Sequence, residues 1–206
     1  RSPDTNTTYY NPQVRYLPWI QSNGKRLPAA NPAAARLEPV ARSITVDLTQ
    51  GEQARNAAWC YGKGERNCSF VGLSEQPYQP GLYYRLRTES SAYLDPREAK
   101  SYEEFNVNDP GKTFTRFPGR SDCAADPCTQ AEERQNFANW FVYYRNRLLL
   151  AKASVAEALQ PVGDTIRLGY GRINSPPQLV DGDGPFPVIE SGVRDFSADR
   201  KAEVFR

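Results

Sequence analysis

The sequence predicts an α/β segment that follows a long region rich in loops and short β-strands. Three patterns support this: a long helix with an apolar stripe at 129–159, an alternating strand pattern at 165–174, and short β-like runs between prolines, glycines and cysteines before residue 128. A helix followed at once by a strand is typical of an α/β layer. We therefore divide the chain into a β- and loop-rich region, 1–128, and an α/β segment, 129–206.

The composition agrees with an ordered fold that carries long loops. With 206 residues and 39% hydrophobic residues, the chain can bury one sizeable core. The mean hydropathy is −0.70, and 17 prolines, 14 glycines and 12% aromatic residues predict a loop-rich surface over an aromatic core.

Residues 1–42 are expected to form an extended strap anchored by aromatic side chains. This N-terminal strap contains YYNP at 9–12, YLPW at 16–19 and a proline- and alanine-rich stretch at 27–39, where prolines remove backbone donors and disfavour helix. The aromatic residues would be costly to leave in water, which argues against a disordered arm. They are also candidate contact residues: Tyr9, Tyr10, Tyr16 and Trp19.

From 43 to 117 we expect short strands and turns. SITVDL at 43–48 and GLYYRLR at 81–87 show apolar residues with a period of two. Segment 93–105 predicts a short helical turn after Pro96, and 109–119 predicts a turn, a strand and a second turn.

Four cysteines lie in two close pairs, Cys60 with Cys68 and Cys123 with Cys128. Pairing of neighbours would close two short loops and would fit an oxidising compartment outside the cytoplasm, although three pairings are possible on paper. The alternative is a four-thiolate zinc site, which prefers two to four residues between cysteines. Because the spacings here are seven and four residues, we favour two local disulfides and expect no metal.

The strongest local prediction is a helix from Thr129 to about Leu159. Thr129 and the glutamate of TQAE predict a capping box at its start. Its apolar stripe consists of Phe137, Phe141, Tyr144, Leu148, Ala151, Val155 and Leu159. Outside this stripe, Tyr143, Arg145 and Arg147 are candidates for surface contacts.

After the helix, TIRLGYGRIN at 165–174 predicts a strand, and DGDGPFPVIE at 181–190 predicts a turn and a short strand. RDFSADRKAEVFR at the end predicts the first turns of another helix. DGDG superficially suggests a calcium loop, but it has neither a third ligand nor the closing glutamate, so we favour a plain turn.

Several function classes fit the sequence poorly. A net charge of +2 without a long basic run argues against nucleic acid, and no apolar stretch reaches the roughly 18–20 residues of a membrane span. Histidine is absent, which excludes histidine-dependent triads and histidine metal ligands. Paired carboxylates could still serve a secreted carbohydrate-active domain, with Asp95, Glu98, Glu103 and Glu104 as candidates. We expect no enzymatic activity.

The run 122–159 and the following IRLGYGRIN resemble the PilY/PilC family of type IV pilus tip proteins. The cysteine pair, NFANW at 136–140, YYRNR at 143–147 and GYGRIN at 169–174 occur in that family in the same order, and YYNP and YLPW resemble its upstream segment. The resemblance is strongest at 122–174 and weakest at 43–80.

This resemblance implies a von Willebrand factor A-like, Rossmann-like domain interrupted by a long insertion, which would be residues 1–128. It implies a non-catalytic role in pilus biogenesis, adhesion and retraction control, at the pilus tip, cell surface or outer membrane of a Gram-negative bacterium. The implied partners are the rest of the parent protein, minor pilins and a host or surface receptor.

Two departures limit what the resemblance implies. The D-x-S-x-S metal motif of the domain type and the family's calcium-dependent propeller are both absent from this sequence. Calcium or magnesium would therefore belong to a full-length parent, and we expect no cofactor in this chain. Because the sequence has no methionine and has arginine at both ends, we expect an internal piece, compatible with trypsin-like trimming. The alternative is a secreted carbohydrate-binding or carbohydrate-active domain.

Overall fold

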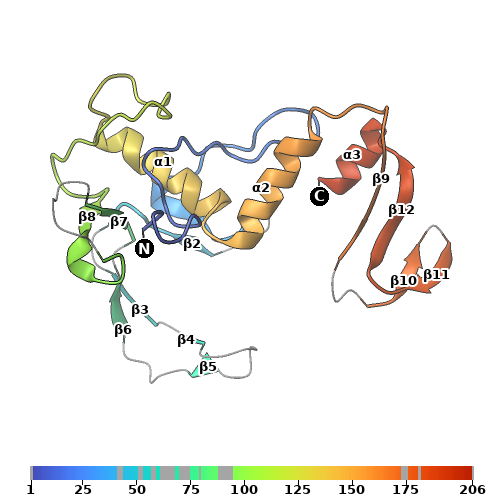
Figure 1. Ribbon diagram of the computed structural model, residues 1–206, viewed down its shortest axis with the longest axis horizontal. Helices are drawn as coiled ribbons and strands as arrows, with labels where there is room; N and C mark the ends of the chain where they lie inside the picture. Colours follow the sequence, from blue (N-terminus) through green and yellow to red (C-terminus); the bar gives the residue numbers. More distant parts are fainter. Residues whose placement is uncertain are drawn as a thin grey trace. The chain divides into compact units, whose positions relative to one another are not determined.

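The computed structural model describes residues 2–40, 44–50, 53–56, 59–60, 68–69, 75–78, 80–87, 95–172, 176–180 and 182–205 (Figure 1). The chain forms two compact units. The first comprises Arg1–Pro18 and Ala29–Leu150, and the second comprises Trp19–Pro28 and Ala151–Arg206. Among the described residues, no helix has the length and apolar composition that crossing a bilayer requires.

Helix α1, Gln130–Tyr143, begins where the sequence predicts. The Thr129 hydroxyl accepts from the Glu132 amide, and the Glu132 carboxylate accepts from the Thr129 amide, so the predicted capping box is confirmed. Glu132 also accepts from the Ala124 amide at 2.7 Å. These hydrogen bonds satisfy backbone donors that every helix N-terminus leaves without partners.

The hydrogen bonds to Glu132 lead to a prediction about acid stability. Backbone bonds from Ala124 and Thr129 lower the pKa of Glu132, so its stabilising effect is present above its ordinary pKa of about 4.3 and is lost as pH falls through the lowered value. Glu132→Gln should therefore reduce the loss of stability on acidification. Melting temperatures from pH 7 to pH 3 test this, and parallel curves for both proteins would contradict it.

The prediction of one continuous helix to Leu159 is wrong, although a helix does end at that residue. The chain leaves α1 at Tyr144, and a second helix, α2, spans Arg147–Leu159. The Tyr144 hydroxyl donates to the Leu17 carbonyl at 2.6 Å, while the Asn146 side chain accepts from the Leu149 amide and starts the new helix. Arg145 donates to the Phe141 carbonyl at the end of α1.

This break also makes the predicted apolar stripe wrong in its second half. Phe137 and Phe141 are buried on α1, but Leu148 and Val155 on α2 are 77% and 53% exposed. Since the break interrupts the helical phase, α2 buries a different set, with Leu149 and Ala153 inside.

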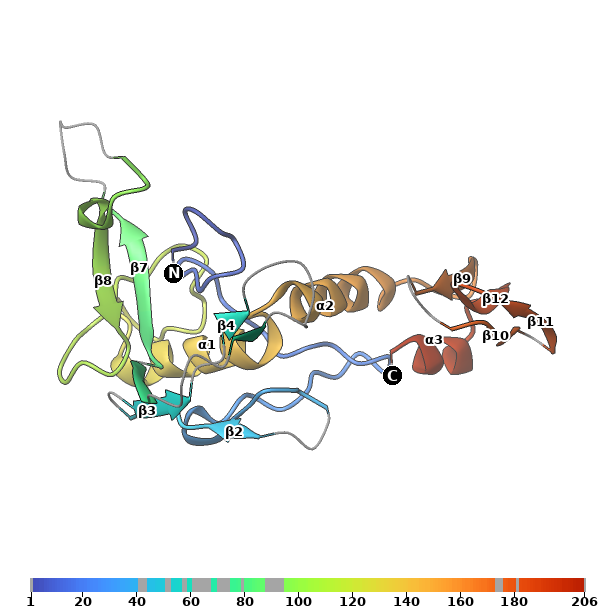
Figure 2. The same ribbon diagram turned by 90° about the horizontal axis from the view of Figure 1, so that it is seen from below.

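The first unit contains short antiparallel strand pairs rather than one sheet. The pairs are β1 (Ala35–Arg36) with β2 (Thr45–Val46), β3 (Gln53–Asn56) with β6 (Glu75–Tyr78), β4 (Trp59–Cys60) with β5 (Cys68–Ser69), and β7 (Leu82–Leu86) with β8 (Tyr102–Asn106). Figure 2 shows β7 and β8 side by side. The predicted strand at 81–87 is thus confirmed, and the expected helical turn after Pro96 is the 3-10 turn Ala99–Ser101.

Tyr10 occupies the centre of the first unit's core. Its side chain is 1% exposed, and its ring meets those of Tyr83, Phe137 and Trp140 edge-on, with centroids 5.0–5.7 Å apart. Such aromatic contacts stabilise a core beyond the effect of buried area. The aromatic anchoring expected of the strap is confirmed, because Tyr10 and Trp19 are buried. The expectation of an extended chain holds only in part, since hydrogen-bonded turns and the 3-10 turn Pro32–Ala34 interrupt residues 2–40.

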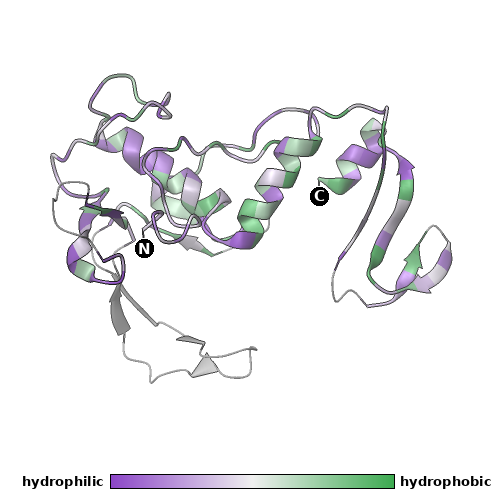
Figure 3. Ribbon diagram, in the orientation of Figure 1, coloured by the Kyte–Doolittle hydropathy of each residue, from purple (hydrophilic) through white to green (hydrophobic). Residues whose placement is uncertain are grey.

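The second unit is built on an antiparallel pair of strands, β9 (Arg167–Gly171) and β12 (Ile189–Asp195). Between them in sequence lie β10 (Gln178–Val180) and β11 (Asp183–Phe186), and helix α3 (Ala198–Val204) follows. The predicted strand at 165–174 and the final helix are confirmed. Figure 3 shows hydrophobic stretches on α2, β10 and β12, where Leu179 and Val193 are 68% and 65% exposed.

Arg200 and Lys201 of α3 hold the second unit together. The Arg200 guanidinium donates to the Gly192 carbonyl at 3.0 Å and lies over the Tyr170 ring. Lys201 donates to the carbonyls of Gln160 and Val162, which follow the end of α2. A lysine at this position satisfies carbonyls that the helix leaves without partners.

Candidate functional site

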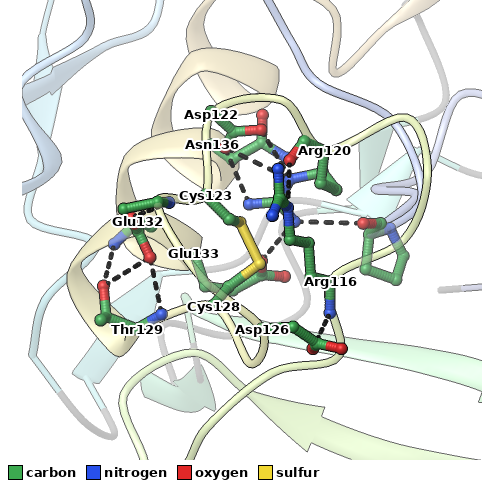
Figure 4. Close-up of a disulfide and its surroundings, with 12 residues drawn as sticks. Arg116, Arg120, Asp122, Cys123, Asp126, Cys128, Thr129, Glu132, Glu133 and Asn136 are labelled. Carbon is green, nitrogen blue, oxygen red and sulfur yellow. Dashed lines mark hydrogen bonds and ion pairs between the residues drawn. A yellow bond between two sulfur atoms is a disulfide. The ribbon is translucent and has the colours of Figure 1, made fainter.

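The most unusual group of charges is a buried ion pair between Arg120 and Glu133. Arg120 lies on the loop that precedes the cysteine pair, and Glu133 lies in the first turn of α1 (Figure 4). Both side chains are fully buried, and the Arg120 guanidinium donates to the Glu133 carboxylate. Charges are rarely buried unless they are paired, because leaving water costs several kcal/mol per ion.

Four further partners complete this cluster, and one of them is the Tyr83 hydroxyl of β7, which donates to Glu133 at 3.4 Å. Arg120 also donates to Asp122 at 2.9 Å and to the Pro12 carbonyl at 3.1 Å, and the Tyr10 hydroxyl donates to Glu133 at 2.8 Å. The cluster therefore joins the N-terminal strap, β7, the cysteine loop and α1.

The electrostatics keep the arginine charged and the tyrosine protonated. Burial acts to lower the pKa of Arg120, but its bonds to Asp122 and the charge of Glu133 raise that pKa overall. Burial, and then the neighbouring Glu133 charge, raises the pKa of Tyr10. Burial likewise raises the pKa of Glu133, and the Arg120 charge opposes that shift. Because the Arg120 guanidinium stays charged and the Tyr10 phenol stays protonated, both remain hydrogen-bond donors to Glu133. The cluster thereby cross-links the segments that carry these residues.

The Cys123–Cys128 disulfide fastens the loop that carries this arginine. The predicted bond is present, with Cα atoms 5.1 Å apart (Figure 4). Both cysteines are buried in a cluster with Phe114. Phe114 also exchanges two backbone hydrogen bonds with Cys128. The loop is thus closed covalently and by a β-bridge at the start of α1.

Removing this disulfide should lower stability moderately. Replacing Cys123 and Cys128 by serine is expected to cost about 2 kcal/mol, because the cross-link closes only a short loop in the unfolded chain. Urea unfolding of both proteins under oxidising conditions measures the difference. An unchanged midpoint would contradict the proposed fastening of the loop.

Side chains of α1 bind the backbone of the N-terminal strap along a first limb, residues 8–18. Asn136 accepts from the Tyr16 amide at 2.7 Å and donates to the Val14 carbonyl at 2.8 Å. Asn139 donates to the Tyr16 carbonyl, and Trp140 donates to the Thr8 carbonyl, each at 3.0 Å. Side chains of α1 therefore provide the backbone of the first limb with the hydrogen-bond partners that a neighbouring strand would provide in a sheet.

Gly119 allows the cysteine loop to approach the first limb. A Cβ atom at this position would lie 2.5 Å from the Gln13 carbonyl oxygen. Gly119→Ala is therefore expected to cost about 1–3 kcal/mol through overpacking. Gly163→Ala is the matched control, since a Cβ there meets no atom within 4 Å. Thermal unfolding compares the two variants, and equal melting temperatures would refute the steric argument.

The predicted contact residues are placed very differently from one another. Tyr10 and Tyr143 are 1% and 4% exposed, and Trp19 is also buried, so these three belong to the interior. Tyr9, Tyr16 and Arg145 are half-buried, and Arg147 is exposed. The structure brings Tyr10 and Tyr16 together on the first limb but does not gather all seven into one surface.

The cysteine pair Cys60 and Cys68 lies in strands whose side chains fall outside the described part of the structure. The backbone register places Cys60 directly opposite Cys68 in an antiparallel pair. Opposed residues in such pairs have Cα atoms about 4.5 or 5.5 Å apart, and both spacings suit a disulfide. This second bond stays a prediction.

The carboxylates considered for sugar hydrolysis have local partners. Asp95 pairs with Arg97, Glu98 pairs with Lys100, and Glu104 accepts from Tyr84. Glu103 lies on β8 beside Glu104 and is exposed. Within the described residues, no group of three or more histidine, cysteine, aspartate or glutamate side chains is arranged to hold a metal ion.

Comparison with curated proteins finds similarity to a pilus protein. The chain is 22% identical over 182 residues, 85% of its length, to "Type IV pilus biogenesis factor PilY1" of Pseudomonas aeruginosa (strain UCBPP-PA14). This chain is similar to PilY1. The protein of the same name from strain PAK is 29% identical over 75 residues, 36% of this chain.

The aligned regions span only 13% and 6% of these two relatives. No protein-family profile matches the chain, and no solved structure matches it. The similarity to PilY1 agrees with the resemblance that the cysteine pair and the motifs at 136–147 and 169–174 indicate. It does not assign a role to any single residue.

Proposed function

We propose that this chain is a non-catalytic structural part of a type IV pilus biogenesis factor. The observation that carries the proposal is the alignment with PilY1 over 85% of the chain. The architecture supports a structural role, because the buried polar cluster around Arg120 and Glu133 is closed to solvent and cross-links four segments. Because the cluster is closed to solvent, a substrate has no access to it. Its hydrogen bonds instead fix the positions of the segments that it joins, which suits a contact surface of constant shape.

We also propose the finer features that the resemblance implies. Residues 129–206 would belong to a von Willebrand factor A-like α/β domain, and 1–128 would be its insertion. The confirmed disulfide supports a location outside the cytoplasm, at the pilus tip or cell surface. The partners would be the remainder of the parent protein, minor pilins and a surface receptor, with roles in adhesion and retraction control.

Deleting the codons for these residues from the parent gene tests the proposal. We expect fewer surface pili by electron microscopy and weaker co-purification of minor pilins. A variant carrying Ala158→Ser, at an exposed position of α2, serves as the control for expression. Normal piliation and unchanged co-purification after the deletion would overturn the proposal, and saturable glycan-array binding would favour a carbohydrate-binding domain instead.

A further inference from the structure

The sequence contains one five-residue pattern twice: an acidic residue, any residue, asparagine, any residue and a residue with a hydroxyl. It occurs as DTNTT at 4–8 and as ERNCS at 65–69. Its last three positions form the Asn-x-Ser/Thr acceptor motif for N-linked sugars on surface loops of secreted proteins. Every such motif in the sequence carries the acidic residue as well, which gives a transferase a charge at fixed spacing to recognise. Asn67 of the second motif lies outside the described residues, so the structure bears on the first, at Asn6.

Asn6 lies on an exposed turn that precedes the buried anchor Tyr10. Residues 4–7 are all exposed, whereas Tyr10 is 1% exposed. The Tyr9 amide donates to the Asn6 carbonyl at 3.0 Å and closes the turn. A bulky group attached to the Asn6 side chain would therefore extend into solvent and leave the aromatic core as it is.

The Asn6 side chain uses its oxygen in the fold and leaves its nitrogen accessible. Oδ1 accepts from the Thr8 amide at 3.0 Å and from the Thr8 hydroxyl at 2.8 Å. Nδ2 has no hydrogen-bond partner among the described residues. Asn23 forms the same type of turn with the Lys25 amide, but its partner brings no hydroxyl. The acceptor nitrogen, the hydroxyl and exposure thus coincide at Asn6.

We propose that Asn6 is an acceptor site for an N-linked glycan, transferred from a lipid-linked sugar diphosphate by a transferase outside the cytoplasm. In this reaction Asn6 Nδ2 forms a bond to the anomeric carbon of the sugar while the bond from that carbon to the diphosphate oxygen breaks. The diphosphate keeps the electron pair of the broken bond, and one amide proton passes to a base of the transferase. Oδ1 keeps both hydrogen bonds to Thr8, so the modified asparagine fits the turn that the structure shows.

The proposal goes beyond the pilus assignment and requires only that the chain is exported. The Cys123–Cys128 disulfide supports export independently, because such bonds persist mainly outside the cytoplasm. Sugar on Asn6 is measured on the chain itself. Its absence would leave the expected effect of the deletion on piliation untouched, and normal piliation after the deletion would leave the glycan proposal untouched.

Mass spectrometry of the protein purified from the cells that produce it tests the proposal. Trypsin cleaves after Arg1 and Arg15 and releases residues 2–15, which contain Asn6. We expect this peptide to be heavier by one or more sugar residues, and electron-transfer fragmentation to place them on Asn6. Asn6→Gln and Thr8→Ala should each abolish the added mass. Thr7→Ala, the matched control on the same exposed turn, should keep it.

Three results would overturn the proposal. The first is a 2–15 peptide without added mass. The second is added mass that mild alkali removes by β-elimination, because this treatment releases sugars from threonine oxygen and leaves sugars on asparagine nitrogen. The third concerns Thr8→Ser, which keeps a hydroxyl and should retain at least part of the added mass; a loss as complete as that of Thr8→Ala would exclude recognition of the motif.

Discussion

Glu133→Gln is expected to destabilise the protein by about 3–5 kcal/mol, the usual cost of breaking a buried ion pair by removing one partner. The substitution keeps the side-chain shape but leaves Arg120 charged, fully buried and facing an amide in place of a carboxylate. It also leaves one acceptor oxygen in place of two, so Arg120 and the Tyr10 hydroxyl can no longer each donate to an oxygen of their own. Urea unfolding followed by tryptophan fluorescence measures the change in free energy.

A matched control lies in the second unit. Arg26 and Glu157 form a similar contact at 2.6 Å, but their side chains are 31% and 46% exposed. Glu157→Gln should cost less than about 1 kcal/mol, because exposed pairs contribute little. If Glu133→Gln and Glu157→Gln lowered the free energy of unfolding equally, burial of the Arg120–Glu133 pair would add nothing to its effect on stability.

The double variant Arg120→Met, Glu133→Leu separates charge from packing. Replacing both partners removes both buried charges, so it should recover part of the stability that either single replacement loses. Recovery would be incomplete because Asp122 and the Pro12 carbonyl lose their donor. A double variant less stable than both single variants would contradict this account.

Tyr10→Ala is expected to cost about 3–5 kcal/mol, as truncation of a large core aromatic does. Its ring contacts four aromatic neighbours, and its hydroxyl both donates to Glu133 and accepts from Asn136. Loss of this anchor should release the first limb from α1. Hydrogen exchange at the Tyr16 amide, bound to Asn136 at 2.7 Å, would detect that release directly.

Two controls divide this effect into its parts. Tyr10→Phe keeps the ring and loses the hydroxyl, so about 1–3 kcal/mol is expected. Tyr9→Ala changes the half-buried neighbour and should cost clearly less than Tyr10→Ala. A larger loss of stability for Tyr9→Ala than for Tyr10→Ala would show that a residue other than Tyr10 anchors the strap.

Local signals in the sequence were enough to predict the start of α1 and the presence of β7 and β9. The capping box at Thr129 and Glu132 correctly started α1, and the alternation in 81–87 and 165–174 correctly predicted β7 and β9. The break after Tyr143 depends on a hydrogen bond from Tyr144 to Leu17, 127 residues away in sequence, which no local pattern reports. Asn146 was the available clue, because asparagine is a preferred helix N-cap.

The buried cluster could not be predicted for a similar reason. Glu133 follows the capping glutamate by one residue. A second acidic residue in the first turn of a helix is normally interpreted as a surface charge that interacts favourably with the helix dipole. One step along a helix rotates the side chain by about 100°, which turns Glu133 inward while Glu132 stays at the surface. Asn136 and Asn139, buried on the same helix as Glu133, were the visible sign that α1 binds polar backbone.

Because α1 binds the first limb mainly through backbone carbonyls and amides, this attachment depends little on which side chains the limb carries. Residues of that limb other than Tyr10 and Tyr16 should therefore tolerate wide substitution. Asn136 and Asn139 should tolerate almost none, since each uses both ends of its amide. The side chains of the limb could then diversify between related proteins while the residues of α1 that bind its backbone stay the same.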